Sequence, residues 1–306
     1  MFKIKGLISF PLIFSFLFLV FIWNISLPEN FQEAAVAVDG FAKSGTEFSE
    51  LIAETNIEGQ SYLVFDFFGR IIASRKSDLQ WPLASLTKLM TALLTEENIG
   101  KEAVISVSRR AISAEGDDGF LAEEIFRRDD LRDAMLIHSS NDAAYALAEH
   151  FGWDEFIKLM NQKAAFLGMA QTFFFDPAGL DFSKTSAGAY GSAGDLMILL
   201  GYLMENHPQV LEATRLPFLK IESLEGNKHR FTNTNRLIYE IPQFLAGKTG
   251  FTDIAGGNLA VVADIGINQP VGIIILGSSE KGRFEDVLKL YQATRKWFQN
   301  HPLLFK

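Results

Sequence analysis

Three short motifs stand in this order along a chain of 306 residues: Ser85-Leu-Thr-Lys88, Ser139-Ser-Asn141 and Lys248-Thr-Gly250. Each motif alone is weak evidence, because Ser278-Ser-Glu-Lys281 is a second S-x-x-K sequence and Lys43-Ser-Gly45 nearly matches the third motif. The ordered set is far more specific. It predicts a fold that brings three distant segments of the chain into one cleft, as sites with a nucleophile, a base and an orienting group require.

The first motif is expected at the start of a helix over residues 84–97. One broad face of that helix is apolar and is formed by Leu86, Leu89, Met90, Leu93 and Leu94. Ser85 and Lys88 lie on the other side, where their i, i+3 spacing brings the amine to the hydroxyl. Free backbone N–H groups in the first turn can stabilise an oxyanion there. As part of the ordered set, this motif favours a serine nucleophile with a lysine base. In isolation, an S-x-x-K sequence would more often be an ordinary helix start with a solvent-facing lysine.

The amino-acid composition argues against several other kinds of functional site. The chain contains no cysteine, so it has no thiol nucleophile, disulfide or Cys-ligated metal. Its net charge of −9 argues against a nucleic-acid binder, which would carry a basic stripe. The five histidines show no spacing typical of metal ligands. We therefore expect no metal, no cofactor and no nucleic-acid partner.

The N-terminus carries an uncharged apolar run from Gly6 to Trp23, preceded by Lys3 and Lys5. Its length approaches that of a membrane-spanning helix, and the two lysines predict a cytoplasmic N-terminus with the remainder outside. The competing interpretation is a signal peptide cleaved after Ala37, which would release the protein. We predict an anchor or signal sequence at residues 1–27, a tether at 28–60 and a catalytic domain at 61–306, with a single-pass anchor favoured over cleavage.

The order of predicted elements indicates the fold class. Strands are expected at 62–66 and 70–74, joined by a turn at Gly69, and again at 218–221, 245–250, 258–264 and 271–276. Helices are expected at 130–137, 142–149, 154–167, 192–204 and 282–299. The helix over 154–167 is expected to have Asp154 as its N-cap and to end before Gly168. This order suggests an α/β (α+β) domain whose antiparallel sheet pairs its first and last strands and is covered by helices.

These residues resemble the D-alanyl-D-alanine carboxypeptidases among the low-molecular-weight penicillin-binding proteins, peptidase family S11. The likeness covers about residues 60–299 and extends beyond the three motifs to Asp176-Pro-Ala-Gly-Leu-Asp181 and Asn233-Thr-Asn-Arg-Leu237. It implies a DD-peptidase/β-lactamase-like transpeptidase fold, with an antiparallel central sheet covered by helices on both faces. It also implies β-lactam inhibitors and, as substrate, a peptidoglycan stem peptide that loses its terminal D-alanine.

The resemblance carries roles over to matching residues. Ser85 would be the nucleophile, Lys88 its base and Ser139 a proton relay. Asn141 would bind the substrate amide, and Lys248 and Thr249, followed by Gly250, would bind the terminal carboxylate. The backbone N–H groups of Ser85 and Phe251 would form the oxyanion hole.

Two departures from the family pattern stand out. Ser140 occupies a position where many relatives have glycine, so we expect its side chain at the edge of the cleft. A second, β-rich domain and a C-terminal amphipathic anchor are not evident, and the N-terminal span would replace that anchor.

Three alternatives to a carboxypeptidase remain open. A DD-endopeptidase would cut peptidoglycan cross-links with the same groups. A β-lactamase is disfavoured because the sequence shows no convincing glutamate-bearing loop for deacylation. A catalytically silent, membrane-tethered binding module would keep the fold without the chemistry.

Overall fold

The computed structural model describes residues 52, 55–116, 118–266 and 268–300. The apolar run from Gly6 to Trp23, the Ala35-Val-Ala37 sequence and most of the expected tether lie outside these residues. Within the described ranges, no helix combines the length and the apolar character needed to cross a membrane. The division into anchor, tether and domain therefore stays a prediction.

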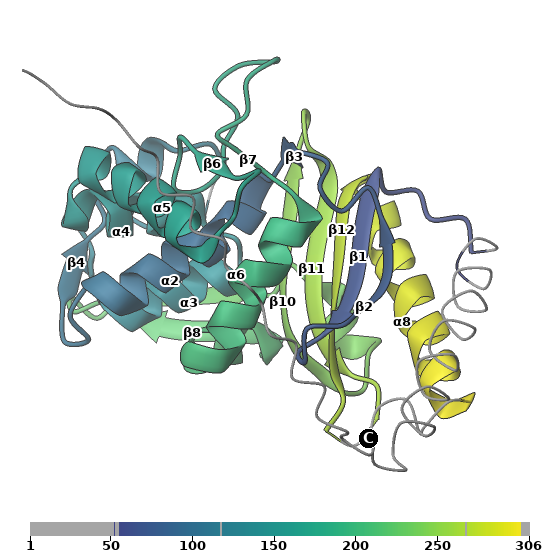
Figure 1. Cartoon of the computed structure of the whole chain (residues 1–306). Coiled ribbons are helices and arrows are strands. Elements are labelled where there is room, and N and C mark those ends of the chain that lie inside the picture. Colours follow the sequence, from purple (N-terminus) through teal and green to yellow (C-terminus); the bar gives the residue numbers. More distant parts are fainter. Residues whose placement is uncertain (1–51, 53–54, 117, 267, 301–306) are drawn as a thin grey trace, which may run out of the picture. The chain divides into compact units, whose positions relative to one another are not determined.

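A five-stranded antiparallel sheet with the order β10-β11-β12-β1-β2 forms the centre of the domain (Figure 1). Its strands are β1 (Ser61–Asp66), β2 (Ile71–Arg75), β10 (Phe244–Thr252), β11 (Gly256–Asp264) and β12 (Pro270–Ser278). The first strand pairs with the last, with Leu63 opposite Ile274. The predicted antiparallel sheet and the pairing of its first and last strands are confirmed.

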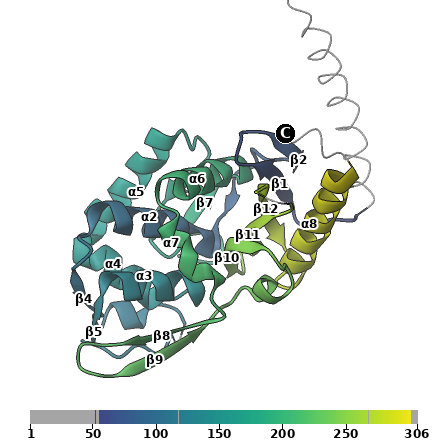
Figure 2. The ribbon, with the colours of Figure 1, turned by 90° about the horizontal axis from the view of Figure 1, so that it is seen from below.

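Both faces of this sheet are buried. Successive side chains of a strand point to opposite faces, so β1 contributes Leu63 and Phe65 to one apolar core and Val64 to the other. The second core is closed by α8 (Gly282–Asn300), and the first faces the helical part of the domain (Figure 2). Ile57, just before β1, is buried in the core beneath α8.

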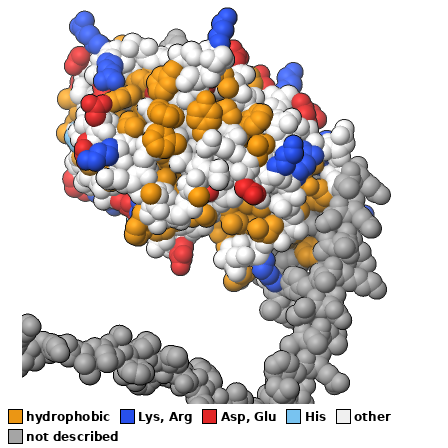
Figure 3. Space-filling model, turned by 45° about the horizontal axis from the view of Figure 1, so that its top comes forward, with side chains coloured by type: hydrophobic (Ala, Val, Ile, Leu, Met, Phe, Trp, Pro, Cys, Tyr) orange, Lys and Arg blue, Asp and Glu red, His pale blue; other side chains and the backbone are white. Residues whose placement is uncertain are grey.

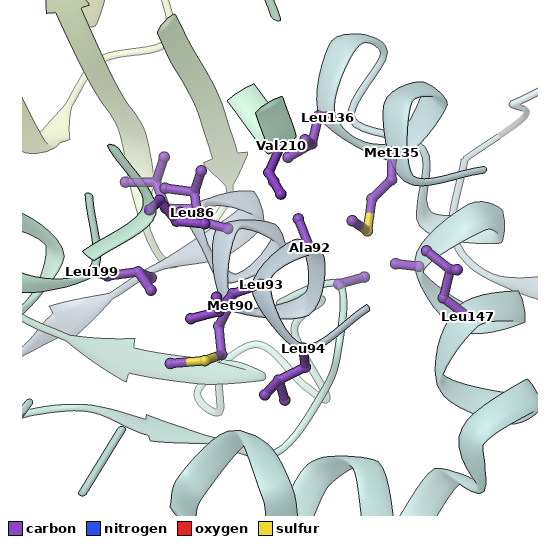
Figure 4. Packing of buried hydrophobic residues seen from close by; sticks show 14 of the residues in the cluster. Leu86, Met90, Ala92, Leu93, Leu94, Met135, Leu136, Leu147, Leu199 and Val210 are labelled. Carbon is purple, nitrogen blue, oxygen red and sulfur yellow. The ribbon is translucent and has the colours of Figure 1, made fainter. Parts of the chain in front are cut away.

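The helical part surrounds α2 (Lys88–Asn98), whose first eight residues are all buried. Leu93 and Leu94 of this helix contribute to a core that also contains Met135, Leu147 and Leu199 from other helices (Figure 4). The other helices are α3 (Arg128–Ile137), α4 (Asn141–Phe151), α5 (Trp153–Leu167), α6 (Ala193–Asn206) and α7 (Gln209–Glu212), with 3₁₀ turns η1 (Ala84–Thr87), η2 (Ala111–Ser113), η3 (Ala213–Arg215) and η4 (Arg236–Tyr239). Because its first eight residues are buried, a group on the first turn of α2 is removed from solvent.

Three small sheets complete the domain. Their strands are β3 (Trp81–Pro82), β7 (Ala189–Gly191) and β6 (Phe173–Phe174) in one sheet, β4 (Val104–Ser106) with β5 (Ile125–Arg127), and β8 (Phe218–Glu222) with β9 (Lys228–Thr232). The sheet of β3, β7 and β6 is joined to η1 by Leu83, the residue between β3 and η1, whose N–H donates to the Ala189 carbonyl of β7 over 2.9 Å.

Several helix starts lie one or two residues from the expected positions, and two of them differ from the prediction in local geometry. The expected helix over 84–97 begins with the 3₁₀ turn η1, whose first residue Ala84 has φ 47°, and it becomes α-helical only at Lys88. Asp154 is not an N-cap, because α5 begins at Trp153 after Gly152, whose φ of 109° supplies the change of direction. The expected end of that helix is confirmed, since Gly168 is left-handed with φ 81°.

Candidate active site

Ser85 and Lys88 meet where η1 passes into α2. Lys88 Nζ donates to Ser85 Oγ over 2.8 Å, to Asn141 Oδ1 over 2.7 Å and to the Ala178 carbonyl over 2.9 Å. The contact predicted from the i, i+3 spacing is therefore present, and the alternative of a solvent-facing lysine is wrong because Lys88 is fully buried. Three acceptors fix the amine beside the serine hydroxyl.

Burial is also the main influence on the charge of Lys88. It lowers the pKa of this amine from 10.5 to about 7, against the opposing effect of the Asp176 and Asp118 carboxylates. Near neutral pH a substantial fraction of Lys88 is therefore uncharged and can accept a proton. The pKa of Lys248 is also lowered, to well below its usual value. Burial is the largest cause, the positive charges of Lys88 and Arg283 add to it, and the Asp118 carboxylate opposes it.

The turn after β6 completes the surroundings of Lys88. Asp176 Oδ1 accepts from the N–H groups of Ala178 and Gly179 over 2.8 and 2.7 Å, which fixes the loop whose Ala178 carbonyl binds the lysine. Gly179 has φ 79°, and a Cβ there would lie 2.1 Å from the Ala84 carbonyl oxygen. Only glycine lets this turn approach the backbone next to the nucleophile.

The second motif joins the two lysines. Lys248 Nζ donates to Ser139 Oγ over 2.7 Å, and Asn141 Oδ1 accepts from Lys88. Ser139 is in the left-handed region with φ 66°, a conformation that costs a non-glycine residue energy and is common at functional sites. The Asn141 amide nitrogen donates to the Glu115 carbonyl over 2.6 Å. Ser139 and Asn141 thus connect Lys248 and Lys88 to the same turn.

The expected position of Ser140 is wrong. Its side chain is fully buried and does not lie at the edge of the cleft. Ser140 is the N-cap of α4, where its Oγ accepts from the Ala143 N–H over 3.1 Å and donates to Asp118 Oδ2 over 2.9 Å. A hydroxyl at this position satisfies an unpaired N–H at the helix start, which a glycine could not do.

The third motif lies on β10. Lys248 and Thr249 are almost fully buried, and Thr249 Oγ1 is 2.6 Å from Thr234 Oγ1. A Cβ on Gly250 would be 3.2 Å from the backbone nitrogen of Ser85, so the glycine allows β10 to lie against η1. The strand therefore brings Phe251, the other expected oxyanion residue, next to the nucleophile's turn. The oxyanion role of both N–H groups stays a prediction.

A cleft of about 880 Å³ opens above these groups. Ser85, Asn141 and Phe251 line it, together with the segments 179–184 and 252–254 and with Glu115 and Gly116. The two lysines and Thr249 are almost fully buried and do not line the cleft, whereas Ser85 and Asn141, the hydrogen-bond partners of Lys88, do. A cleft of this volume can take a short peptide segment.

Exposed aromatic rings continue from one wall of the cleft. The Phe173 and Phe175 rings are 4.8 Å apart, and Phe175 is 6.5 Å from Phe182, which lines the cleft. All three side chains are exposed. Figure 3 presents the side from which the loop between β6 and β7 projects in Figure 1, and apolar side chains are exposed there. The approach to the cleft is therefore partly apolar.

Sequence reasoning missed two charged residues at the site. Arg283, at the start of α8, donates to the Gly250 carbonyl over 2.5 Å, and burial lowers its pKa to about 10. Asp118 accepts three hydrogen bonds from the second motif and its neighbours. Neither residue belongs to a spaced motif, so a single sequence offered no signal for them.

Comparison with known proteins finds D-alanyl-D-alanine peptidases, some named carboxypeptidases and some named endopeptidases. Residues 48–280 match the Peptidase_S11 family model, described as D-alanyl-D-alanine carboxypeptidase. The chain is 31% identical over 277 residues to the D-alanyl-D-alanine carboxypeptidase DacF of Bacillus subtilis, covering 87% of this chain and 69% of the relative. It is 34% identical over 230 residues to a D-alanyl-D-alanine endopeptidase of Haemophilus influenzae, covering 72% and 76%. The structure of penicillin-binding protein D2 from Listeria monocytogenes in its ampicillin-bound form is also similar, with a TM-score of 0.66, 31% identity and coverage of 78% and 98%.

Proposed function

Because the chain belongs to the Peptidase_S11 family of D-alanyl-D-alanine carboxypeptidases, we propose that Ser85, Lys88 and Ser139 carry out its reaction. The protein is a serine-type D-Ala-D-Ala carboxypeptidase, a hydrolase that removes the terminal D-alanine of peptidoglycan stem peptides and binds β-lactams. The observation that carries the assignment of roles is the buried Lys88 amine, 2.8 Å from Ser85 Oγ, with a pKa of about 7.

Acylation begins with proton transfer from Ser85 to uncharged Lys88. The Ser85 oxygen attacks the carbonyl carbon of the penultimate D-alanine, and the backbone N–H groups of Ser85 and Phe251 stabilise the oxyanion. The C–N bond then breaks, and the proton that Lys88 took from Ser85 passes through Ser139 to the leaving amine of the terminal D-alanine, so that Lys88 is uncharged again. The hydrogen bond from Lys248 to Ser139 supports this relay.

Deacylation uses the same groups in the reverse sense. Lys88 removes a proton from a water molecule, the water oxygen attacks the ester carbonyl of the acyl-enzyme, and the proton returns to Ser85 as the ester bond breaks. Asn141, bonded to Lys88 and to the Glu115 carbonyl, orients the amide of the stem peptide. The products are the shortened peptide and free D-alanine.

Lys248 and Thr249 bind the terminal carboxylate of the substrate in this proposal. The pKa of Lys248 is lowered by burial and by neighbouring cations, and an incoming carboxylate would raise that pKa and favour the charged ammonium. A charge-assisted contact in a desolvated site contributes about 1.5 to 3 kcal/mol, or about ten- to a hundredfold in selectivity.

A stem pentapeptide ending in D-Ala-D-Ala should therefore be cleaved about ten- to a hundredfold faster, in kcat/KM, than its C-terminal amide. Lys248→Ala should remove most of that preference, because the amine that recognises the acid is gone. The measurement is D-alanine or D-alaninamide release from the two peptides. The control is Lys281→Ala, which removes an exposed cation just before α8. Equal rates for acid and amide with the unaltered protein would contradict the carboxylate role.

The endopeptidase alternative rests on the similarity to the Haemophilus influenzae protein of that name. The same carboxylate contact could bind the free D-centre carboxylate of a cross-link, so the third motif does not separate the two activities. Adding a purified cross-linked dimer to the assay separates them. Faster cleavage of the dimer than of the pentapeptide would assign the protein as an endopeptidase.

We also propose that the run from Gly6 to Trp23 remains attached and anchors the catalytic domain at the outer face of the cytoplasmic membrane. The proposal is supported by the uncharged run behind Lys3 and Lys5. Mass spectrometry of the protein from membranes of producing cells should find the intact N-terminus. A mature chain that starts at Val38 would instead demonstrate a cleaved signal sequence and a released enzyme.

A further inference from the structure

Asp118 lies in the loop between η2 and β5 and contacts the start of α4 with one carboxylate oxygen. Asp118 Oδ2 accepts from Ser140 Oγ over 2.9 Å, from the Asn141 N–H over 2.7 Å and from the Asp142 N–H over 3.2 Å. Two of these donors are backbone N–H groups at the start of a helix of 11 residues, where a negative charge is favoured. One side chain therefore fixes the backbone of the second motif.

The same loop also fixes the side chain of Asn141. Its amide nitrogen donates to the Glu115 carbonyl over 2.6 Å, and its oxygen accepts from Lys88 over 2.7 Å. Gly116, with φ 113°, lies between these contacts, and a Cβ there would be 3.6 Å from both Asn141 Nδ2 and Asp118 Oδ1. One loop thus binds Asn141 twice: the Asp118 carboxylate binds its main-chain N–H, and the Glu115 carbonyl binds its side-chain amide.

We propose that Asp118 is a positioning residue for the reaction: it fixes the second motif so that Asn141 and Ser139 face the two lysines, and its charge acts on both amines. This inference rests on the function proposed above. Asp118 need not touch the substrate, because its effect passes through Asn141 and through the electrostatic field in the buried site.

The charges around the lysines give the sign of the electrostatic effect. The groups that face Lys88 are Asp118, Asp176 and Lys248, and those that face Lys248 are Asp118, Lys88 and Arg283. The Asp118 carboxylate raises the pKa of both lysines against the effect of burial. Removing its charge lowers both pKa values. Because Lys88 must be uncharged to act as a base and Lys248 charged to bind a carboxylate, both limbs of the pH–rate profile should move to lower pH.

The test compares Asp118→Asn and Asp118→Ala with the unaltered full-length chain. Asn retains the size of the side chain and one carbonyl acceptor, so we expect about a tenfold loss in kcat/KM for D-alanine release, and about a hundredfold for Ala. For Asp118→Asn the acid limb should also move to lower pH. The acylation rate with a fluorescent penicillin should follow the same order, because Asn141 and Lys88 serve both reactions.

Glu123→Gln is the matched control. Glu123 lies in the same segment, its side chain is 67% exposed, and its carboxylate is 3.9 Å from Arg109. This change removes one negative charge without touching the second motif. The rate should therefore remain within about twofold of that of the unaltered protein, and both limbs of the pH–rate profile should stay in place.

The outcomes are distinct. D-alanine release by the unaltered protein, measured first, tests the proposed function by itself. With that activity present, a lower rate and a displaced acid limb for Asp118→Asn, with no change for Glu123→Gln, support the proposal. Unchanged rates, or rates that fall only in proportion to the folded fraction measured by thermal unfolding while the limbs stay in place, overturn it. If Asp118→Ala fails to fold, Asp118→Asn decides.

Discussion

Ser85→Ala should reduce kcat for D-alanine release by about 10⁶-fold and abolish acylation by penicillin, because the hydroxyl oxygen forms the covalent intermediate. The remaining groups could still bind substrate and stabilise an oxyanion, so a small residual hydrolysis by water is expected. Ser85 is partly exposed, and its hydroxyl accepts one hydrogen bond, from Lys88. Because the substitution removes only this hydroxyl, the fold should persist. D-alanine release and thermal unfolding, measured on the same preparation, separate lost chemistry from lost structure.

Ser278→Ala provides the matched control for this result. Ser278 begins the second S-x-x-K sequence but lies at the end of β12, where its hydroxyl donates to Asp286 Oδ2 over 2.8 Å. Asp286 also accepts from the Glu58 and Gly59 N–H groups, so its carboxylate stays satisfied after the substitution. This variant should retain turnover and labelling. Turnover retained by Ser85→Ala would refute the assignment of the nucleophile.

Lys88→Met should cause a loss of at least about 10⁴-fold in both acylation and turnover. Methionine fills the buried volume but cannot accept the proton of Ser85. Because the two residues act as one unit, the double variant with Ser85→Ala should be no worse than the Ser85 variant alone. The outcome that contradicts this is a double variant much less active than either single variant.

The assignment of Lys88 as the base also predicts how the acylation rate of the unaltered protein falls at acidic pH. A base with a pKa of about 7 is mostly protonated at pH 6, so the acylation rate should fall about tenfold below its plateau there. Lys281→Met, in the second S-x-x-K sequence, should leave this limb unchanged. An acylation rate independent of pH between 5 and 8 would exclude Lys88 as the titrating base.

The sequence predicted the central architecture because its strongest patterns are local. Apolar runs in β11 and β12 indicate strands buried on both faces, and Gly69, with φ 89°, provides the turn between β1 and β2. The hairpin strand β9 was missed, because Lys228–Thr232 carries three basic residues and only Phe231 is buried. The 3₁₀ turn at Ala84 depends on its contact with Gly179, which no local pattern encodes.

The residues of the candidate site also fall into those that local motifs predicted and those that depend on long-range contacts. The motifs identified six residues that the structure brings together in two adjoining hydrogen-bonded groups, one with Ser85, Lys88 and Asn141 and the other with Ser139, Lys248 and Thr249, and the main chain of the second motif joins the two groups. Asp118 and Arg283 contribute through long-range contacts, so a single sequence gives no reason to select them among other charged residues. Ser140 was assigned to the wrong environment because a serine in a turn is equally compatible with an exposed edge and a helix cap.

The central claim is that this chain forms an acyl-enzyme on Ser85. The most direct test is to incubate the full-length protein with a penicillin, digest it and identify the modified residue by mass spectrometry. The account predicts one adduct, with the mass of the intact penicillin, on the peptide that contains Ser85. An unmodified protein after prolonged incubation would identify a catalytically silent binding module, and an adduct on any other residue would equally contradict the mechanism.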